Sequence, residues 1–209
     1  MNTLEQTYVH NTYQVIAEQF SHTRAYLWKS VKEFIDNLST YSILLEAGSG
    51  NGKNMKYRKD IINISFDLCS KFCEMTQKDN IDSIIANNLT IPIKSNSIDN
   101  VISIAVIHHL STYERRLQCI KELVRILKTG GRLLIQVWAY EQSAKSRNKF
   151  TKQDNLIEFK NPQQTMKEYR YYYVFKKNEL DNMVKSIQDI KIVKSFWEVG
   201  NWVMIIEKL

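Results

Sequence analysis

The stretch LLEAGSGNGK, residues 44–53, places three of the chain's six glycines within five positions, directly after an apolar run. Glycine lets a backbone turn sharply and approach a ligand, so this stretch predicts a strand followed by a ligand-binding turn. Four further apolar runs follow it along the chain, separated by helical patterns. The expected strands are residues 42–47, 61–66, 82–86, 99–106 and 131–138, with helices at 68–78 and 112–128. This alternation indicates a parallel sheet with helices on both faces.

The last quarter of the chain predicts a different strand arrangement. It holds a strand-like run at 169–175, a helical pattern from 177 to about 187, and strand-like runs at 190–197 and 201–207. Val199-Gly200-Asn201 joins the last two runs and has the composition of a hairpin turn. We therefore expect an α/β, Rossmann-like fold: a mostly parallel seven-stranded sheet that ends in an antiparallel hairpin.

The length of 209 residues favours one domain over residues 1–209. Amphipathic patterns predict an N-terminal helical segment within residues 1–40. Residues 140–168 are polar and basic without an apolar period, and predict a long loop or insertion. Thr129-Gly130-Gly131 is expected to cap the carboxyl end of the 112–128 helix.

Charge and cysteine content narrow the class of protein. The net charge of +7 and the pI of about 9.2 favour an anionic partner. No leader pattern opens the chain and no apolar run reaches the roughly 18 residues of a membrane span, so we expect no membrane association. Cys69, Cys73 and Cys119 lie in apolar segments, which is typical of buried free thiols in a reducing compartment. A cytoplasmic location is expected, and a nuclear one stays open.

The glycine-rich turn matches neither common phosphate-binding motif. A P-loop requires G-x-x-x-x-G-K-[ST], but Ala47 replaces its first glycine and Asn54 its hydroxyl residue. The dinucleotide motif G-x-G-x-x-G requires a third glycine where the chain has Lys53. The ligand is therefore expected to lack a phosphate at this turn.

Three polar landmarks after successive strands point to S-adenosylmethionine. Glu46 precedes Gly48 by two positions, and a carboxylate there attracts the sulfonium and ammonium of this cofactor. Asp67 ends the second strand, where a carboxylate meets a ribose diol. Asn87 follows the third strand, and its oxygen can accept from an adenine amino group. The expected cofactor-binding residues are Glu46, Gly48, Ser49, Gly50, Asn51, Asp67, Leu68, Asn87, Asn88, Leu89, Ile104 and Ala105. Turn residues of an unliganded α/β domain are the alternative.

The order of these motifs resembles the class I S-adenosylmethionine-dependent methyltransferases, and more closely the eukaryotic tRNA (carboxymethyluridine-5-O)-methyltransferases. The resemblance is carried by TYVHNTYQVIAEQFSHTR (7–24), EAGSGNGK (46–53), SIAVIHHLSTYERR (103–116), GGRLLIQVWA (130–139), YRYYYVF (169–175) and GNW (200–202). The first and third blocks are the specific ones. Two departures are Glu46-Ala47-Gly48-Ser49 in place of Asp-x-Gly-Cys, and Tyr173 where a histidine is common.

The resemblance implies that the methyl group goes to the carboxylate of 5-carboxymethyluridine at the tRNA wobble position. A carboxylate with a pKa of about 4 is ionised at neutral pH, so the reaction needs a cradle for the substrate rather than a general base. The expected catalytic residues are Arg24, His108, Trp138 and Arg170. Arg24 is expected in the cradle, and His108 is preferred over His109 for the substrate side. Purely structural roles stay open for each of them.

Binding of a tRNA anticodon loop requires lysines and arginines along phosphates. The expected RNA-binding residues are Arg115, Arg116, Lys145, Arg147 and Lys149, with solvated surface charge as the alternative. The resemblance also implies a small zinc-binding activator subunit, paired as a heterodimer along the sheet edge near residues 82–86. No metal site is expected in this chain. Two other functions stay open: a small-molecule O-methyltransferase, and a non-catalytic binding subunit with a methyltransferase fold.

Overall fold

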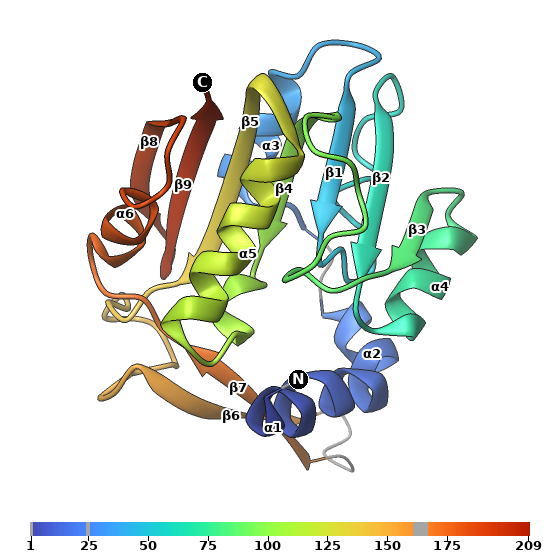
Figure 1. Ribbon diagram of the computed structural model, residues 1–209. Coiled ribbons are helices and arrows are strands. Elements are labelled where there is room, and N and C mark those ends of the chain that lie inside the picture. The colour runs from blue at the N-terminus through green and yellow to red at the C-terminus, as the bar shows by residue number, and fades with distance from the viewer. Residues whose placement is uncertain (1, 24–25, 161–166) are drawn as a thin grey trace.

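The computed structural model describes residues 2–23, 26–160 and 167–209, and its centre is a seven-stranded sheet (Figure 1). The strands follow the order β3-β2-β1-β4-β5-β9-β8, in which β1 to β5 run parallel and β9 runs antiparallel to both its neighbours. They are β1 (Ile43–Ala47), β2 (Ile62–Asp67), β3 (Asp82–Ile85), β4 (Ile98–Ile104), β5 (Leu127–Trp138), β8 (Ile190–Glu198) and β9 (Asn201–Lys208). The predicted fold is confirmed.

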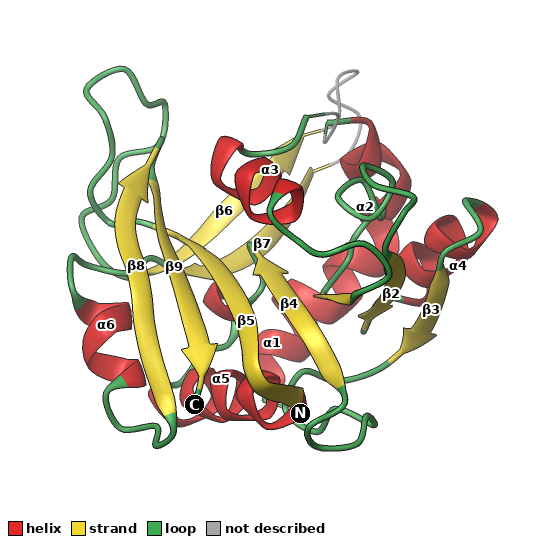
Figure 2. Cartoon of the chain, turned by 90° about the horizontal axis from the view of Figure 1, so that it is seen from above, coloured by secondary structure: helices red, strands yellow, loops and turns green. Residues whose placement is uncertain are grey.

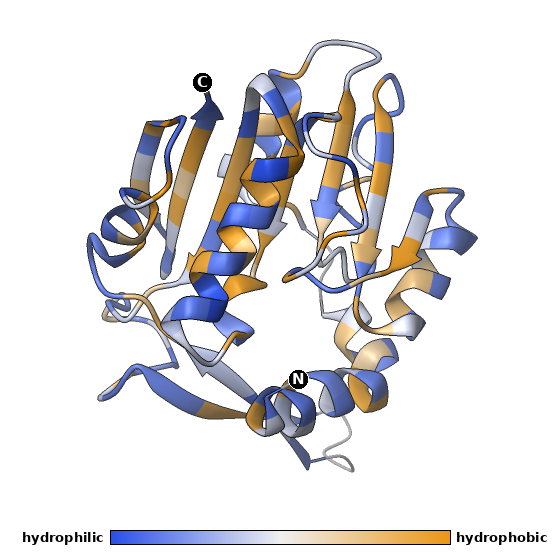
Figure 3. Ribbon diagram, in the orientation of Figure 1, coloured by the Kyte–Doolittle hydropathy of each residue, from blue (hydrophilic) through white to orange (hydrophobic). Residues whose placement is uncertain are grey.

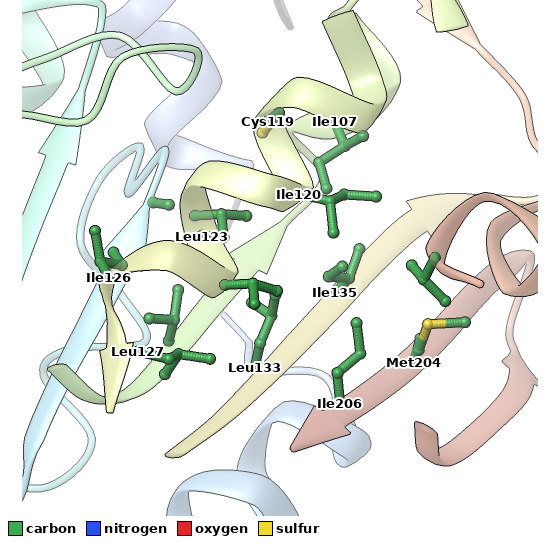
Figure 4. Packing of buried hydrophobic residues seen from close by; sticks show 14 of the residues in the cluster. Ile107, Cys119, Ile120, Leu123, Ile126, Leu127, Leu133, Ile135, Met204 and Ile206 are labelled. Atoms are coloured by element: carbon green, nitrogen blue, oxygen red, sulfur yellow. The ribbon is translucent and has the colours of Figure 1, made fainter. Parts of the chain in front are cut away.

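Helices cover both faces of this sheet (Figure 2). One face holds α3 (Lys29–Asp36), and the other holds α5 (Tyr113–Ile126) and α6 (Glu179–Val184), while α4 (Ser70–Lys78) packs beside β2 and β3. Figure 4 shows Ile120 and Leu123 of α5 packed toward Leu133 and Ile135 of β5. All four side chains are fully buried, so the sheet is a firm base for the strand ends that carry the polar landmarks.

The N-terminal helices run across the carboxyl ends of the parallel strands, below the arrowheads of β1 and β2 in Figure 1. They are α1 (Thr3–Glu5), the π-helical stretch η1 (Gln6–Asn11) and α2 (Thr12–His22). The Asn2 side chain accepts the Leu4 N–H at 2.9 Å and starts this segment. We call residues 3–22 the N-terminal cover.

The helix expected at 112–128 ends earlier than its glycine signal. Helix α5 stops at Ile126, and Leu127 already pairs with Ile98 as part of β5. The register then jumps to Asn100 opposite Arg132, so residues 128–131 form a bulge in β5 instead of a helix cap. Gly130 has a φ of +77°, which explains why glycine occurs at this bulge.

The segment expected as a loop at 140–168 contains a strand. Strand β6 (Asp154–Lys160) pairs antiparallel with β7 (Lys167–Tyr173), and these two strands form a separate sheet. Figure 3 explains why the pattern missed β6: the pair is largely hydrophilic, in contrast to the central strands. Its stability comes from tertiary contacts such as Phe159, which is 6% exposed beside Arg170. The run at 169–175 is therefore a strand, but outside the main sheet.

The three cysteines are free and buried, as predicted. In the described part of the chain, no helix has the length and apolarity of a bilayer span. The same residues contain no group of three or more histidine, cysteine or acidic side chains arranged to hold a metal.

Candidate active site

A cavity lies where the carboxyl ends of β1, β2, β4 and β5 meet the N-terminal cover. The cover contributes Glu5, Val9, His10, Tyr13 and Phe20 to its wall. The strand ends and following turns contribute Glu46, Gly48, Ser49, Gly50, Asn51, Lys53, Asn54, Asp67, Leu68, Asn87, Asn88, Ile104, Ala105, Val106, Gln136 and Trp138. This is the edge at which open α/β sheets bind ligands.

The glycine-rich turn follows β1 and brings backbone to the cavity. Gly48 has a φ of +78°, and a Cβ atom there would lie 2.4 Å from Val106 Cγ2, so no other residue fits. Gly48 N and Ser49 N both donate to the Phe66 carbonyl, at 2.8 and 3.1 Å, and fasten the turn to β2. A Cβ on Gly50 would meet nothing within 4 Å, so this position has open space beside it.

Glu46 is the buried carboxylate of the site, with 1% of its surface exposed. Asn54 Nδ2 donates to Oε1 at 2.5 Å, whereas Oε2 is buried and has no hydrogen-bond partner among the described residues. Burial raises the pKa of Glu46 to about 8, although the Asn54 hydrogen bond opposes the shift. A cationic ligand would supply the missing partner and favour the charged form.

Asp67 occupies the end of β2 and is held by backbone. Its Oδ2 accepts Gly50 N and its Oδ1 accepts Cys69 N, both at 2.9 Å. Each oxygen keeps a second lone pair, which a ribose hydroxyl could donate to. Burial raises the pKa of Asp67, and these backbone N–H groups oppose the rise.

The turn after β3 departs in part from the prediction. Asn87 Oδ1 accepts Leu89 N at 2.9 Å, so one lone pair of this oxygen already stabilises the turn. Asn88 Oδ1 also lies at the cavity, is buried, and has no partner among the described residues. Leu89 packs against the apolar core and is not among the lining residues, so its expected cofactor contact stays a prediction. The other expected cofactor residues all line the cavity.

These observations test whether the site suits S-adenosylmethionine, and it does. The buried Glu46 Oε2 has no hydrogen-bond partner among the described residues, and a sulfonium or ammonium group could fill that place. Asp67 and Asn88 present acceptor oxygens to hydroxyl and amino groups. The backbone N–H of Lys53 donates to Asn51 Oδ1 within the turn, whereas in a P-loop the backbone N–H groups of the turn bind phosphate.

The two adjacent histidines have different environments, and the geometry favours His109 over the expected His108 for the substrate side. His108 is fully buried, its Nδ1 accepts Trp138 N at 3.1 Å, and it is absent from the lining. His109 lines the cavity and joins two elements. Its Nδ1 lies 2.6 Å from the Tyr171 carbonyl, and its Nε2 lies 3.0 Å from the Tyr13 hydroxyl.

The tautomer of His109 follows from these partners. A carbonyl only accepts, so Nδ1 carries the proton and Nε2 accepts from Tyr13. Burial lowers the pKa of His109 to about 3, which keeps the ring neutral at physiological pH. His109 therefore fixes Tyr13 of the cover against the 3₁₀ turn that follows β4 (η2, Ile107–His109).

An aromatic wall continues from the histidines. Trp138 lines the cavity and stacks on Tyr172, with ring centroids 4.3 Å apart and planes 15° apart. Arg170 is 7% exposed and lies behind this wall, with its guanidinium 5.3 Å from the Tyr172 ring, so direct substrate contact by Arg170 is not supported. Arg24 lies outside the described residues, and its role stays a prediction.

Two expected RNA-binding arginines are used inside the protein. Arg115 pairs with Glu5 of the cover, with its Nε 2.8 Å from Oε1. Arg116 is 4% exposed, donates to the Leu110 carbonyl at 2.9 Å, and places its guanidinium 3.5 Å from the Tyr173 ring centre. Arg116 is too buried to reach a tRNA phosphate, whereas Arg115 is 26% exposed, so its expected role stays a prediction. Lys145, Arg147 and Lys149 are exposed, so their expected role is not contradicted.

Sequence reasoning missed the cover residues of the site. Glu5, His10 and Tyr13 all line the cavity, and the π-helical stretch containing His10 has no sequence signature that we recognised. His10 Nδ1 is buried without a partner among the described residues. Ala105 was expected, but not its left-handed backbone, which has a φ of +61° at the end of β4. The signal that could have found His10 and Tyr13 is their place in the family-specific block 7–24, whereas Glu5 lies before that block.

Comparison with known proteins agrees with this geometry. A methyltransferase domain profile matches residues 45–135. The tRNA (carboxymethyluridine(34)-5-O)-methyltransferase of Schizosaccharomyces pombe is 34% identical over 226 residues, covering 98% of this chain and 97% of that protein. The protein of the same name, alkbh8, from Xenopus tropicalis is 30% identical over 262 residues, covering all of this chain but only 42% of its own length. The chain thus spans less than half of that longer relative.

Among solved structures, a complex of the Trm112 methyltransferase activator with a putative methyltransferase from Haloferax volcanii is similar in fold. The superposition has a TM-score of 0.71 at 14% sequence identity, and covers 96% of this chain and 97% of that one.

Proposed function

We propose that this chain, which belongs to the family of tRNA (carboxymethyluridine(34)-5-O)-methyltransferases, methylates the carboxylate of 5-carboxymethyluridine at the tRNA wobble position. The observation that carries the proposal is the cavity itself. A buried carboxylate oxygen of Glu46, which has no hydrogen-bond partner among the described residues, lines this cavity together with the family-specific N-terminal segment. The Schizosaccharomyces pombe relative, which matches over nearly its whole length, supports the same substrate.

The cofactor side of the cavity would hold S-adenosylmethionine. Glu46 would face its cationic groups, Asp67 its ribose, and Asn87 and Asn88 its adenine, while Gly48 and Gly50 let the backbone approach. When bound, this cofactor supplies a methyl group on a positively charged sulfur. Such an electrophile needs only an ionised acceptor aimed at it.

The acceptor side of the cavity suits a carboxylate. His109 is neutral, and its Nε2 is engaged by Tyr13, so this histidine is not poised to act as a general base. A carboxylate substrate requires none, whereas a phenol or alcohol substrate would. Trp138 stacks on Tyr172 and presents an aromatic surface against which a uracil ring could lie.

The proposal includes a small zinc-binding activator as partner. Strand β3 is at the end of the sheet, and the exposed fractions of Ile62, Ile84 and Ile85 are 50%, 48% and 60%. An exposed apolar edge of this kind invites pairing with another chain. The Haloferax volcanii complex contains a methyltransferase activator and supports this part of the proposal.

The activity is tested by incubating the protein, co-purified with its activator, with S-adenosylmethionine and tRNA that carries 5-carboxymethyluridine. Formation of the methyl ester, detected by mass spectrometry of digested nucleosides, is the expected result. Methylation of a small acid without any tRNA ester would overturn the proposal. Failure to bind S-adenosylhomocysteine in calorimetry would instead indicate a non-catalytic binding subunit.

The activator surface is tested separately by co-expression. We expect Ile84→Lys to abolish co-purification of the small zinc protein. Val193→Lys is the matched control, because Val193 is 44% exposed on β8 at the opposite edge of the sheet. Equal loss in both variants would contradict pairing at β3.

A further inference from the structure

The positive charge of this protein is not equally available over its surface. The cations of α5 and of the bulge after it are largely engaged by acidic partners. These pairs are Arg115 with Glu5, Arg125 with Glu122, Lys128 with Asp99, and Arg132 with Glu207, at 2.5 to 3.1 Å. Arg116 is buried. The surface that looked most basic in the sequence therefore has little charge left for phosphates.

A second basic surface retains its charge. Lys145 and Arg147, after β5, and Lys176 and Lys177, after β7, are exposed, and none forms an ion pair with a described acidic residue. Lys176 Nζ lies 5.5 Å from the Tyr140 ring centre. The only acidic group in the pocket between these two segments is Glu141.

The Glu141 side chain accepts hydrogen bonds from neutral N–H groups, so it keeps its one negative charge against the four exposed cations of this surface. Its Oε1 accepts Lys177 N at 3.0 Å, and its Oε2 accepts Trp202 Nε1 at 3.1 Å. Its backbone carbonyl accepts Trp197 Nε1 at 2.9 Å. Both indole N–H groups in the pocket are thereby anchored, which fixes the edges of the rings.

Trp197 remains 39% exposed in this pocket, although tryptophan is usually well buried. An anchored aromatic ring beside unpaired lysines is the combination that binds single-stranded nucleic acid, because bases stack on the ring and phosphates meet the cations. A membrane or an acidic protein would use the charge, but would have no use for the stacking geometry.

The pocket lies close to the catalytic cavity along the chain. Trp138 and Asn201 line the cavity and are paired across β5 and β9, and Trp202 follows Asn201 directly into the pocket. Glu141 lies three residues after Trp138, so at most about 10 Å of chain separates the two sites. Single-stranded RNA with its target base in the cavity would reach the pocket with a neighbouring nucleotide.

We infer that Trp197 and Lys177, which line this pocket, bind the single-stranded anticodon loop next to the methylated nucleotide. Lys145 and Arg147, which follow Ser143 of the pocket wall along the chain, extend this binding surface. This inference rests on the proposed function. Trp197 stacks on a loop base, and the three cations contact the adjoining phosphates.

The test measures binding and catalysis in parallel. Affinity of the activator-bound protein for a labelled anticodon stem-loop RNA is followed by fluorescence anisotropy, and S-adenosylhomocysteine binding by calorimetry. Trp197→Ala is expected to weaken RNA binding at least about tenfold, since one base stack is lost, and to leave S-adenosylhomocysteine binding unchanged. Trp197→Tyr keeps a stacking ring and should restore most of the affinity, which distinguishes stacking from misfolding.

The charge component has its own matched control. Lys145→Glu with Arg147→Glu should weaken RNA binding and reduce its dependence on salt concentration. Lys121→Glu, an exposed lysine on α5, should change both much less. If Trp197→Ala binds RNA normally while the unmutated enzyme makes the tRNA ester, the inference is overturned but the proposed function stands. If Trp197→Ala loses a bound partner protein while its RNA affinity is intact, this surface binds protein instead of RNA, and the inference is also overturned. An unmutated enzyme that makes no tRNA ester overturns the proposed function instead.

Discussion

The floor of the cofactor cavity, formed by the ends of β1 to β4, comes from turns that follow successive strands, whereas its N-terminal cover is held by contacts between distant residues. Glu46, Asp67 and Asn87 each lie directly at or after a strand end. The cover is fixed by Glu5 to Ser111, Tyr13 to His109 and Thr12 to Tyr169, separated by 106, 96 and 157 residues. The difference teaches that the floor is set by residues close together in the sequence, whereas the position of the cover is set by contacts between residues far apart in the sequence.

If that division is right, damage to the floor should abolish cofactor binding with the cover still folded. Gly48→Ala is the strongest such change, because its Cβ would collide with Val106 and its φ of +78° is strained. We expect affinity for S-adenosylhomocysteine in calorimetry to fall more than about hundredfold, or about 3 kcal/mol. Gly130→Ala is the control, with a φ of +77° but no neighbouring atom within 4 Å. Equal loss in both would mean that backbone strain, not the cavity, is responsible.

Glu46→Gln tests the charge of the floor. Removing a buried carboxylate that faces a cation should weaken cofactor binding about tenfold to hundredfold, since charge-assisted hydrogen bonds contribute about 1.5–3 kcal/mol. Glu33→Gln, at an exposed helix position, should have no effect. Unchanged affinity in Glu46→Gln would show that the cofactor's cationic groups lie elsewhere.

The same residue predicts a pH dependence of folding. The pKa of Glu46 is raised from 4.5 to about 8 in the folded protein, so the folded state holds this proton more tightly than the unfolded state. Its contribution to stability is complete below about pH 4.5 and is lost as the pH rises toward 8, with a slope of at most about 1.4 kcal/mol per pH unit. Urea unfolding of the cofactor-free protein between pH 6.5 and 8 should show this slope, because the opposing contribution of His109, whose pKa is lowered from 6.5 to about 3, is complete above pH 6.5. The slope should be absent in Glu46→Gln, and an equal slope in that variant would rule out Glu46 as its source.

Glu5→Ala tests how the cover is held. It removes four hydrogen bonds, from Ser111 N, Ser111 Oγ and two nitrogens of Arg115, and leaves that arginine without its carboxylate. We expect faster hydrogen exchange in residues 3–22 and a cofactor affinity lower by about tenfold or less, because the floor stays intact. Hydrogen exchange should stay slow in β1 and β4. Exchange that rises equally there would mean that cover and floor form one cooperative unit.

His10→Ala is expected to have the smallest effect. His10 Nδ1 is buried at the cavity and has no partner among the described residues, so a hydrogen bond to the bound cofactor is the one that the substitution would remove. Loss of one such bond costs about 1 kcal/mol, or roughly fivefold in cofactor affinity. His22→Ala, an exposed histidine on the same helical segment, should leave affinity unchanged. A loss as large as that of Glu46→Gln would make the cover an equal partner in cofactor binding.

Particular residues show how far sequence patterns predict this molecule. The positions of the central strands along the chain, and of Glu46, Gly48 and Asp67 at their ends, follow from short-range periodicity and spacing, and the structure confirms them. Strand β6 was not predicted, because its residue pattern is polar and because it is stabilised by a tertiary contact of Phe159 with Arg170. His108 and His109 could not be distinguished, because adjacent residues share every sequence signal and differ only in what surrounds their rings.

The sequence by itself determined the class of ligand and the edge of the sheet where it binds, since spacing along a strand and turn sets which side chains appear there. Only the tertiary structure decided which charges are available. Arg115 and Arg116 count as cations in the sequence, yet one pairs with Glu5 and the other is buried against Tyr173. Charge is a property of a residue, but its availability depends on burial and partners, and distant parts of the chain supply both.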